Sequence, residues 1–394
     1  MKYILFLIII GCLFSCNKAE VVSTESEGVS APWVDTSSKH PKAAQFDALL
    51  KKYKQKGLPG ISLLIRDSKG TWFGASGKAD IKSNISFKPG TVSKTASITK
   101  LLIGALVFKL MEDSANTKIG FNDLQTKVSK WIPDAVLSKI ANGREITLGQ
   151  CMKHETGIPD IISESKFYLA VLNNPNKKWG AEELLSYIYE KPALFKQGNS
   201  AAYSNTNTIL VSMVIEAQTG RKHSDLLHEL IFRPLAMNQT YYHPHDVLPA
   251  NVAQAYFDLY NNNAIVNVSN LITGNGNGYV GVYSNLFDLY NFANALFINQ
   301  TLLKPSSLQL MQTYEKRDGS NYYGYGLQKS YLDNGIDFGI GHKGRDLGYS
   351  ANLFYFPNKK VLHILFVNYG TDAKSNLREV FSQFVDEMIA ASLN

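Results

Sequence analysis

Near the start of the chain, the spacing of apolar residues predicts a helix, a two-stranded hairpin and a second helix. Apolar residues recur at helical spacing before a closing Gly57, at Ala43, Phe46, Leu49, Leu50 and Tyr53. A strand predicted over residues 60–66 leads through a turn at 67–70 into a returning strand over 71–81. A strongly apolar helix is then predicted over residues 97–111.

The middle of the chain, residues 115–275, carries several amphipathic segments separated by Gly, Pro and Asn turns, without convincing strand alternation. A further helix is predicted over residues 284–297, with Ser284 as its cap. Strand patterns return near the C-terminus, and a final helix follows them; these elements are predicted over residues 336–342, 350–356, 361–368 and 377–391.

Strands at both ends and helices between them indicate one sheet that both ends of the chain build together. The hairpin turns favour antiparallel pairing. We therefore predict an α/β (α+β) fold, in which helices flank a mostly antiparallel sheet and an all-helical region is inserted over about residues 115–275. No repeat of fixed period occurs in the sequence.

The first 39 residues differ from the rest of the chain. Lys2 precedes an apolar run over residues 3–14, which is too short to span a bilayer and is typical of a secretory signal. The run ends in Leu-Phe-Ser-Cys16, which resembles a bacterial lipobox. We expect a lipoprotein signal peptide (1–15), lipidation of Cys16, a flexible tether (16–39) and one folded domain (40–394). The lipid would anchor the protein to a membrane of the cell envelope, on its periplasmic or cell-surface side; a plain signal peptide is the alternative.

The composition is that of an ordinary globular protein, with 45% hydrophobic and 19% charged residues among 394. The net charge of +7 is mild, and the lack of a dense Lys/Arg block argues against nucleic-acid binding. Cys151 is the one cysteine beyond residue 16. Its apolar surroundings favour an inert core residue over a nucleophile.

Candidate chemistry begins with Ser97 and Lys100, an S-x-x-K pair that opens a predicted helix and shares one helix face. A serine hydroxyl needs a base, and a lysine can serve when desolvation and nearby positive potential keep it neutral. The helix start supplies such potential, and the N–H of Ser97 would donate to a developing oxyanion. A second match at residues 163–166 is interpreted as a solvated turn.

Two further segments add polar groups. Tyr203 would shuttle a proton, and Asn205 would bind the lysine and a substrate carbonyl. His342 and Gly344 share one face at the end of the predicted strand from residue 336. Gly344 would let the substrate lie close to the backbone, and the N–H of Arg345 would be a second oxyanion donor.

The order of these three motifs resembles the serine β-lactamase and penicillin-binding-protein superfamily, in its branch with Y-x-N and H-x-G. That branch is similar to class C β-lactamases, D-alanyl-D-alanine carboxypeptidases, D-aminopeptidases and related esterases. The resemblance covers roughly residues 40–390, with further matches at 146–159 and 324–327. It implies a catalytic set of Ser97 as nucleophile, Lys100 as base and Tyr203, and a substrate-binding set of Asn205, His342, Gly344 and Arg345.

By this resemblance the protein is expected to be a serine hydrolase that forms an acyl-enzyme at Ser97, without a cofactor or metal. A small molecule or peptide would be the substrate, and ester, D-amino-acid peptide and β-lactam bonds stay open. A slow penicillin-binding or sensor protein is the alternative. Lys343 and Arg345 stand where relatives carry small residues, so they would either favour an anionic substrate or crowd the pocket.

Three other motifs are weaker. Residues 276–281 match G-x-G-x-x-G but lack the surrounding strand–helix series of a nucleotide site, so we expect a tight loop beside the pocket. His243 and His245 lack the further ligands of a zinc hydrolase. His154 is expected to be a hydrogen-bonded structural residue.

Overall fold

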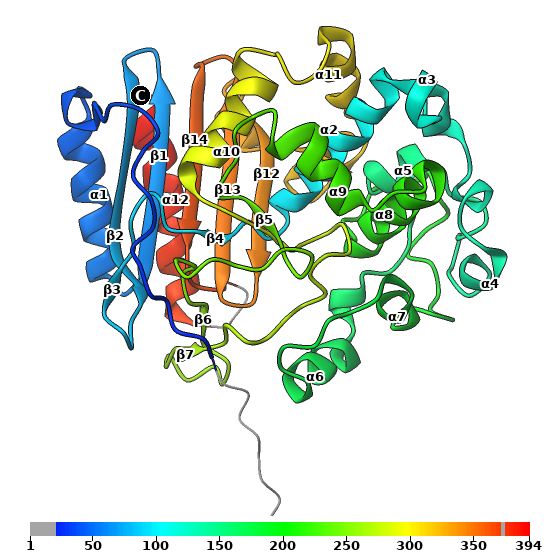
Figure 1. Cartoon of the computed structure of the whole chain (residues 1–394), viewed down its shortest axis with the longest axis horizontal. Helices are drawn as coiled ribbons and strands as arrows, with labels where there is room; N and C mark the ends of the chain where they lie inside the picture. Colours follow the sequence, from blue (N-terminus) through cyan, green and yellow to red (C-terminus); the bar gives the residue numbers. More distant parts are fainter. Residues whose placement is uncertain (1–20, 372–374) are drawn as a thin grey trace, which may run out of the picture.

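One antiparallel sheet joins the two ends of the chain. The computed structural model describes residues 21–371 and 375–394. Within the sheet, β1 (Gly60–Asp67) pairs with β14 (Val361–Val367) on one side and with β2 (Gly70–Asp80) on the other. The predicted sheet of N- and C-terminal segments is therefore confirmed (Figure 1).

The full sheet has nine strands in the order β3-β2-β1-β14-β13-β12-β11-β10-β9. Next to β14 lie β13 (Tyr349–Phe356) and β12 (Gly339–Asp346), joined by a tight turn. Short strands complete the two edges: β3 (Ile85–Ser86), β9 (Arg317–Asp318), β10 (Asn321–Tyr323) and β11 (Gln328–Ser330).

The expected end of β12 at His342 was wrong. The strand starts three residues later than Ile336 and continues to Asp346, because its polar half pairs with β13 from His342↔Leu353 to Asp346↔Tyr349. Pairing with β13 keeps these polar residues in the strand, and the spacing of apolar residues does not reveal such pairing. His342 and Gly344 consequently lie inside a strand.

Helices cover both faces of the sheet. On one face, α1 (Ala43–Gln55) packs beside α12 (Asn376–Leu393), with a shared core that includes Phe46, Tyr53 and Phe384. On the other face lies α2 (Ile98–Glu112), which is buried on nearly every side. A helix that is apolar all round belongs in the interior, so α2 forms the centre of the molecule between sheet and helical region.

The predicted helical insert contains α3 to α9: Ser114–Thr117, Asp134–Leu137, Leu148–Met152, Ser165–Asn173, Ala181–Ser186, Asn205–Thr219 and His223–Leu227. Single turns of 3₁₀ or π helix accompany them and the later elements at Ser37–Lys39, Phe121–Gln125, Val128–Lys130, Ile161–Ser163, His228–Phe232, Asn294–Ile298 and Leu332–Asn334. The insert also holds two-residue strands, β5 (Tyr241–Tyr242), β6 (Tyr256–Phe257) and β7 (Val266–Asn267). A strand of two residues has no period, so alternation could not predict these.

The helix expected from Ser284 begins two residues later, at Leu286. Ser284 ends β8 (Val282–Ser284), which joins β4 (Ser93–Lys94) and β5 in a small second sheet. The cap of α10 (Leu286–Ala293) is Asn285, whose side chain accepts from the N–H groups of Phe287 and Asp288 at 3.0 and 2.9 Å. The proposed cap was wrong because β8 pairing holds Ser284. Farther on, the chain forms α11 (Pro305–Met311).

The described part of the expected tether lies along the folded domain (Figure 1). The N–H of Thr24 donates to Asp80 Oδ2 at 3.1 Å. Trp33 packs its ring 5.3 Å from that of Phe287 and 6.3 Å from that of Phe73. Residues 21–39 thus pack on the domain instead of leading away from it. The signal peptide and Cys16 lie outside the described residues, so lipidation, the domain boundaries and the envelope location stay predictions.

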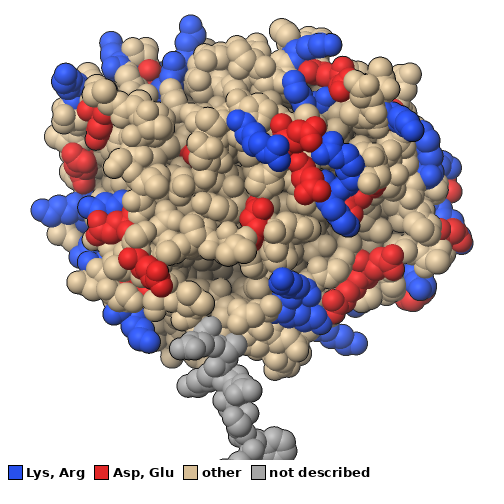
Figure 2. Space-filling view, viewed as in Figure 1, with Lys and Arg blue, Asp and Glu red and all other residues tan. Residues whose placement is uncertain are grey.

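Surface and interior agree with a globular protein. Figure 2 shows Lys and Arg interspersed with Asp and Glu on the displayed face, without a field of one sign. Burial raises the pKa of the Cys151 thiol well above its usual range, so this cysteine is a protonated core residue. Among the described residues, no helix has the length and apolar character needed to cross a bilayer.

Candidate active site

Ser97 lies at the N-terminal end of α2, where the free N–H groups of a helix create positive potential. The preceding residue, Ala96, has a φ of 50°, which is the left-handed region that residues with a side chain rarely adopt. Such local strain is common where a chain presents a functional group. Ser97 borders a pocket of about 270 Å³.

Lys100 lies one turn along α2, and its Nζ is 3.0 Å from Ser97 Oγ. The same Nζ lies 2.6 Å from Asn205 Oδ1 and 2.9 Å from the backbone carbonyl oxygen of Tyr279. Both of these oxygens can only accept hydrogen bonds. A neutral amine that donates to both therefore directs its lone pair at the hydroxyl of Ser97.

The electrostatics favour that neutral form. Lys100 is 1% exposed, and burial lowers its pKa to about 7, although the carboxylates of Asp160 and Asp346 act in the opposite direction. No carboxylate of the described residues forms an ion pair with Lys100. A large fraction of the amine is therefore uncharged at neutral pH.

Asp160 is a site residue that the sequence analysis missed. The Nδ2 of Asn205 donates to its two carboxylate oxygens at 3.2 and 2.9 Å, which fixes the orientation of the amide. Burial raises the pKa of Asp160 to about 6. The only hint in the sequence is its position directly after the turn at residues 157–159.

Tyr203 lines the same pocket as Ser97. Its ring lies 4.5 Å from His154 and 5.6 Å from Tyr323, and Lys100 Nζ is 5.1 Å from its centroid. Burial raises the pKa of Tyr203 well above its usual value, and a side-chain hydrogen bond with Ser97 opposes this only in part. The phenol is consequently protonated at rest and available as a proton donor.

His154 supports the tyrosine loop, in the hydrogen-bonded role predicted for it. Its Nδ1 accepts from the N–H of Ser204 at 3.2 Å. Burial, with the nearby Lys100, lowers the pKa of His154 to about 3, so the ring is neutral.

On β12, His342 turns toward the same site and its ring lies 6.1 Å from that of Tyr203. Burial, and then Lys100, lowers its pKa well below the usual value, so it offers no positive charge to a substrate carboxylate. The role expected for Gly344 needs correction. A Cβ there would lie 2.1 Å from the carbonyl oxygen of Thr95, so glycine lets β12 approach the chain before Ser97, not a substrate.

Lys343 and Arg345 both border the pocket of Ser97, but their side chains point to the other face of the sheet. The guanidinium of Arg345 lies 4.7 Å from the ring of Phe381 on α12, and Lys343 Nζ lies 5.1 Å from that of Tyr331. The N–H of Lys343 donates to Gln328 Oε1 at 2.9 Å, on the β11 side of the strand. Alternation places the N–H of Arg345 on that side too, which leaves the backbone as its contribution to substrate binding.

The pocket in front of Ser97 has an aromatic wall and a polar end. The wall includes Ile162, Tyr168, Tyr279, Val280 and Tyr323. At the polar end, Asp346 accepts from Thr273 Oγ1 at 2.7 Å and forms a buried ion pair with Lys94 at 2.6 Å. Sequence reasoning identified neither Asp346 nor Lys94, because their pairing joins two distant strands.

Of the weaker motifs, the loop over residues 276–281 borders the pocket as expected and supplies Tyr279 and Val280 to its wall, whereas His243 and His245 do not line it. The second S-x-x-K serine, Ser163, ends a 3₁₀ turn and does not line the pocket. Within residues 21–371 and 375–394, no group of three or more His, Cys, Asp or Glu side chains could hold a metal ion.

The sequence profile of the Beta-lactamase family matches residues 46–382. The chain belongs to the Beta-lactamase family. The predicted superfamily and its fold are confirmed.

A solved structure with the same fold is a D-stereospecific amidohydrolase from Streptomyces sp., with a TM-score of 0.73 and 26% identity. The match covers 86% of this chain and 97% of that one. Curated relatives include Protein flp of Staphylococcus aureus (strain MW2), 28% identical over 199 residues. Another is the D-alanyl-D-alanine-carboxypeptidase/endopeptidase AmpH of Escherichia coli (strain K12), 26% identical over 188 residues.

These curated alignments are partial. They cover 50% of this chain and 37% of Protein flp, and 48% of this chain and 46% of AmpH. The chain thus matches less than half the length of either relative.

Proposed function

We propose that the protein is a serine hydrolase that forms and hydrolyses an acyl-enzyme at Ser97, with Lys100 as base and Tyr203 as proton donor. The observation that carries this proposal is the 3.0 Å distance from Lys100 Nζ to Ser97 Oγ, while two carbonyl oxygens occupy the hydrogens of the amine. An uncharged, fully buried amine in this position removes the hydroxyl proton as Oγ attacks.

In the acylation step, Ser97 Oγ bonds to the substrate carbonyl carbon and its proton passes to Lys100. The N–H groups of Ser97 and Arg345 then donate to the oxyanion. As the carbon–nitrogen or carbon–oxygen bond breaks, Tyr203 protonates the leaving group and regains its proton from Lys100. Lys100 is neutral again, and the acyl group remains on Ser97 as an ester.

Deacylation uses the same groups in reverse roles. A water molecule gives its proton to Lys100 as its oxygen attacks the ester carbonyl. Ser97 Oγ leaves and takes that proton back, and the released product is a carboxylic acid.

The substrate we propose is an amide or short peptide of a D-amino acid. The Streptomyces relative, which this chain matches over most of its length, is named for D-stereospecific amide hydrolysis. The pocket of about 270 Å³ is at the small end for ligand sites, which suits an acyl group of one residue.

The experiment is labelling with a fluorophosphonate and, separately, with a penicillin, followed by mass mapping of the modified peptide. We expect the label on Ser97 and none in Ser97→Ala. The matched control is Ser163→Ala, the serine of the other S-x-x-K motif, which should label like the natural protein. Label on another residue, or none from either reagent, would contradict the proposal.

Turnover then separates the substrate classes. We expect faster release from D-alanine p-nitroanilide than from its L-enantiomer or a chromogenic cephalosporin. Stable labelling of Ser97 by penicillin without turnover of any substrate would favour the sensor alternative.

A further inference from the structure

The loop over residues 274–281, which contains the G-x-G-x-x-G match at 276–281, presents the Tyr279 carbonyl to Lys100. Gly274, Gly276, Gly278 and Gly281 all have positive φ, between 84° and 119°. The loop is pressed against α8, because a Cβ on Gly278 would lie 2.7 Å from the carbonyl oxygen of Thr208. Small changes in its position therefore move an acceptor of the candidate base.

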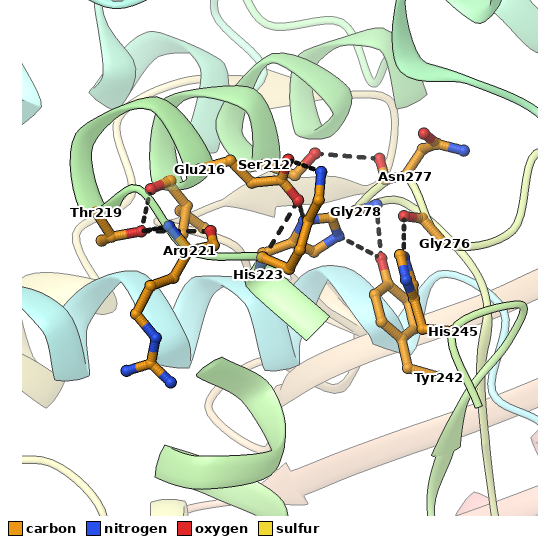
Figure 3. Close-up of polar contacts among 12 residues, drawn as sticks. Ser212, Glu216, Thr219, Arg221, His223, Tyr242, His245, Gly276, Asn277 and Gly278 are labelled. Atoms are coloured by element: carbon orange, nitrogen blue, oxygen red, sulfur yellow. Dashed lines mark hydrogen bonds and ion pairs between the residues drawn. The ribbon is translucent and has the colours of Figure 1, made fainter. Parts of the chain in front are cut away.

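A buried chain of hydrogen bonds holds this loop from behind (Figure 3). The N–H of Gly278 donates to the Tyr242 hydroxyl at 2.7 Å. That hydroxyl lies 3.0 Å from His223 Nε2, and His223 Nδ1 lies 2.7 Å from Glu216 Oε1. Tyr242 and His223 are 0% and 4% exposed, so their polar atoms depend on these partners.

Two routes connect α8 to the amine of Lys100. Asn205, the first residue of α8, contacts Lys100 directly, whereas Glu216 lies three turns farther along α8. From Glu216 the contacts return through His223, Tyr242 and Gly278 to the neighbouring Tyr279 carbonyl. Two acceptors of Lys100 are thus fixed to one helix by separate routes.

Other charged and titratable groups lie around these hydrogen bonds, but none of them takes the place of Glu216, His223 or Tyr242. Lys222 Nζ lies 2.9 Å from Glu216 Oε2. Burial raises the pKa of Glu216, but the hydrogen bonds with His223 and Lys222 outweigh burial and lower this pKa to about 2. His245 stacks on Tyr242 at 5.4 Å, and Asp246 Oδ2 accepts from the Tyr242 N–H at 2.6 Å. Glu216 is therefore a permanent anion that orients His223 with its Nε2 facing Tyr242.

We propose that Glu216, His223 and Tyr242 are positioning residues that hold the Tyr279 carbonyl on Lys100 and so tune this amine as the base. The proposal rests on the proposed function, since it acts through Lys100. Loss of the Tyr242 hydroxyl leaves the Gly278 N–H without a partner, and the loop moves away from the amine. Because a carbonyl acceptor favours the ammonium form, its withdrawal lowers the pKa of Lys100.

The test is Tyr242→Phe, which keeps the ring, with Tyr241→Phe on the same short strand as control. We measure the rate of Ser97 acylation by p-nitrophenyl acetate from pH 5 to 9, with kcat and KM. For Y242F we expect a roughly tenfold lower maximal acylation rate, a nearly unchanged KM and an acid limb moved to lower pH. Y241F should match the natural protein.

His223→Gln, which keeps hydrogen-bonding atoms, should lose less activity than His223→Ala. If Y242F does not fold, the two His223 variants provide the test. Acylation rates equal to that of the natural protein in both His223 variants would overturn the proposal. An acid limb that stays in place or moves to higher pH in Y242F overturns it as well. Labelling of Ser97 in the natural protein distinguishes failure of this proposal from failure of the proposed function. If Ser97 is labelled but Y242F behaves like the natural protein, only the positioning proposal fails. If Ser97 is not labelled, the proposed function fails.

Discussion

At the scale of single residues, the protonation of Lys100 governs the site. Burial lowers the pKa of its amine to about 7, whereas the negative charge of Asp160 favours the ammonium. Asp160 also holds Asn205, whose Oδ1 lies 2.6 Å from the amine. The carboxylate therefore positions Asn205 and also acts on Lys100 through its charge. An amide of the same shape at residue 160 retains part of the positioning and removes the charge.

Asp160→Asn tests the electrostatic effect. Removing the negative charge lowers the pKa of Lys100, so the acid limb of the acylation rate should move to lower pH by roughly half a unit to one unit. The measurement is the pH dependence of p-nitrophenyl acetate acylation. Asp134→Asn, at an exposed ion pair with Arg144, is the control and should leave the limb in place. A shift of D160N to higher pH would contradict the assignment.

The sequence predicted the Ser97–Lys100 contact and the approach of Asn205, because a helix turn and a recognised motif order determine them. Asp160 and the Tyr279 carbonyl could not be predicted in this way. A backbone carbonyl has no side-chain signature, and Asp160 approaches Asn205 only after a turn and a helix from separate segments pack together. Tertiary packing decides both contacts.

At the scale of elements, β12 joins the sheet to α2, the helix that carries Ser97 and Lys100. Its outer-face residues, Lys343 and Arg345, pack toward Tyr331 and Phe381, while Gly344 faces Thr95. Apolar spacing predicted β13 and β14 well because apolar residues make up most of both strands. It ended β12 too early, since polar residues can belong to a strand when partners on both faces accept them.

Gly344→Ala tests this close approach. The added Cβ would lie 2.1 Å from the Thr95 carbonyl oxygen, so β12 must shift away from the start of α2. We expect the free energy of unfolding to fall by about 2 kcal/mol and Ser97 labelling to slow strongly. Denaturant unfolding and labelling kinetics measure the two effects. Gly180→Ala, where a Cβ meets nothing within 4 Å, should change both only slightly. Equal behaviour of the two variants would refute the role given to Gly344.

At the scale of the whole molecule, three distant parts of the chain meet around one hydroxyl. Ser97 and Lys100 come from the central helix, Tyr203 and Asn205 from the start of α8, and the Arg345 N–H from a C-terminal strand. The sheet of both chain ends and the helical insert could be predicted, because strand patterns cluster at the ends. The packing of residues 21–39 on the domain could not, since that segment lacks an apolar period.

The most direct test of the central claim is the rate of Ser97 acylation by a fluorophosphonate as a function of pH, in the natural protein and in Lys100→Met. The amine acts as base only when neutral, so the rate should rise with pH and reach half its maximum near pH 7, the value to which burial lowers the pKa of Lys100. Lys100→Met should fold and lose nearly all labelling. A flat profile from pH 5 to 9, or a Lys100→Met variant that labels at the natural rate, would contradict the account.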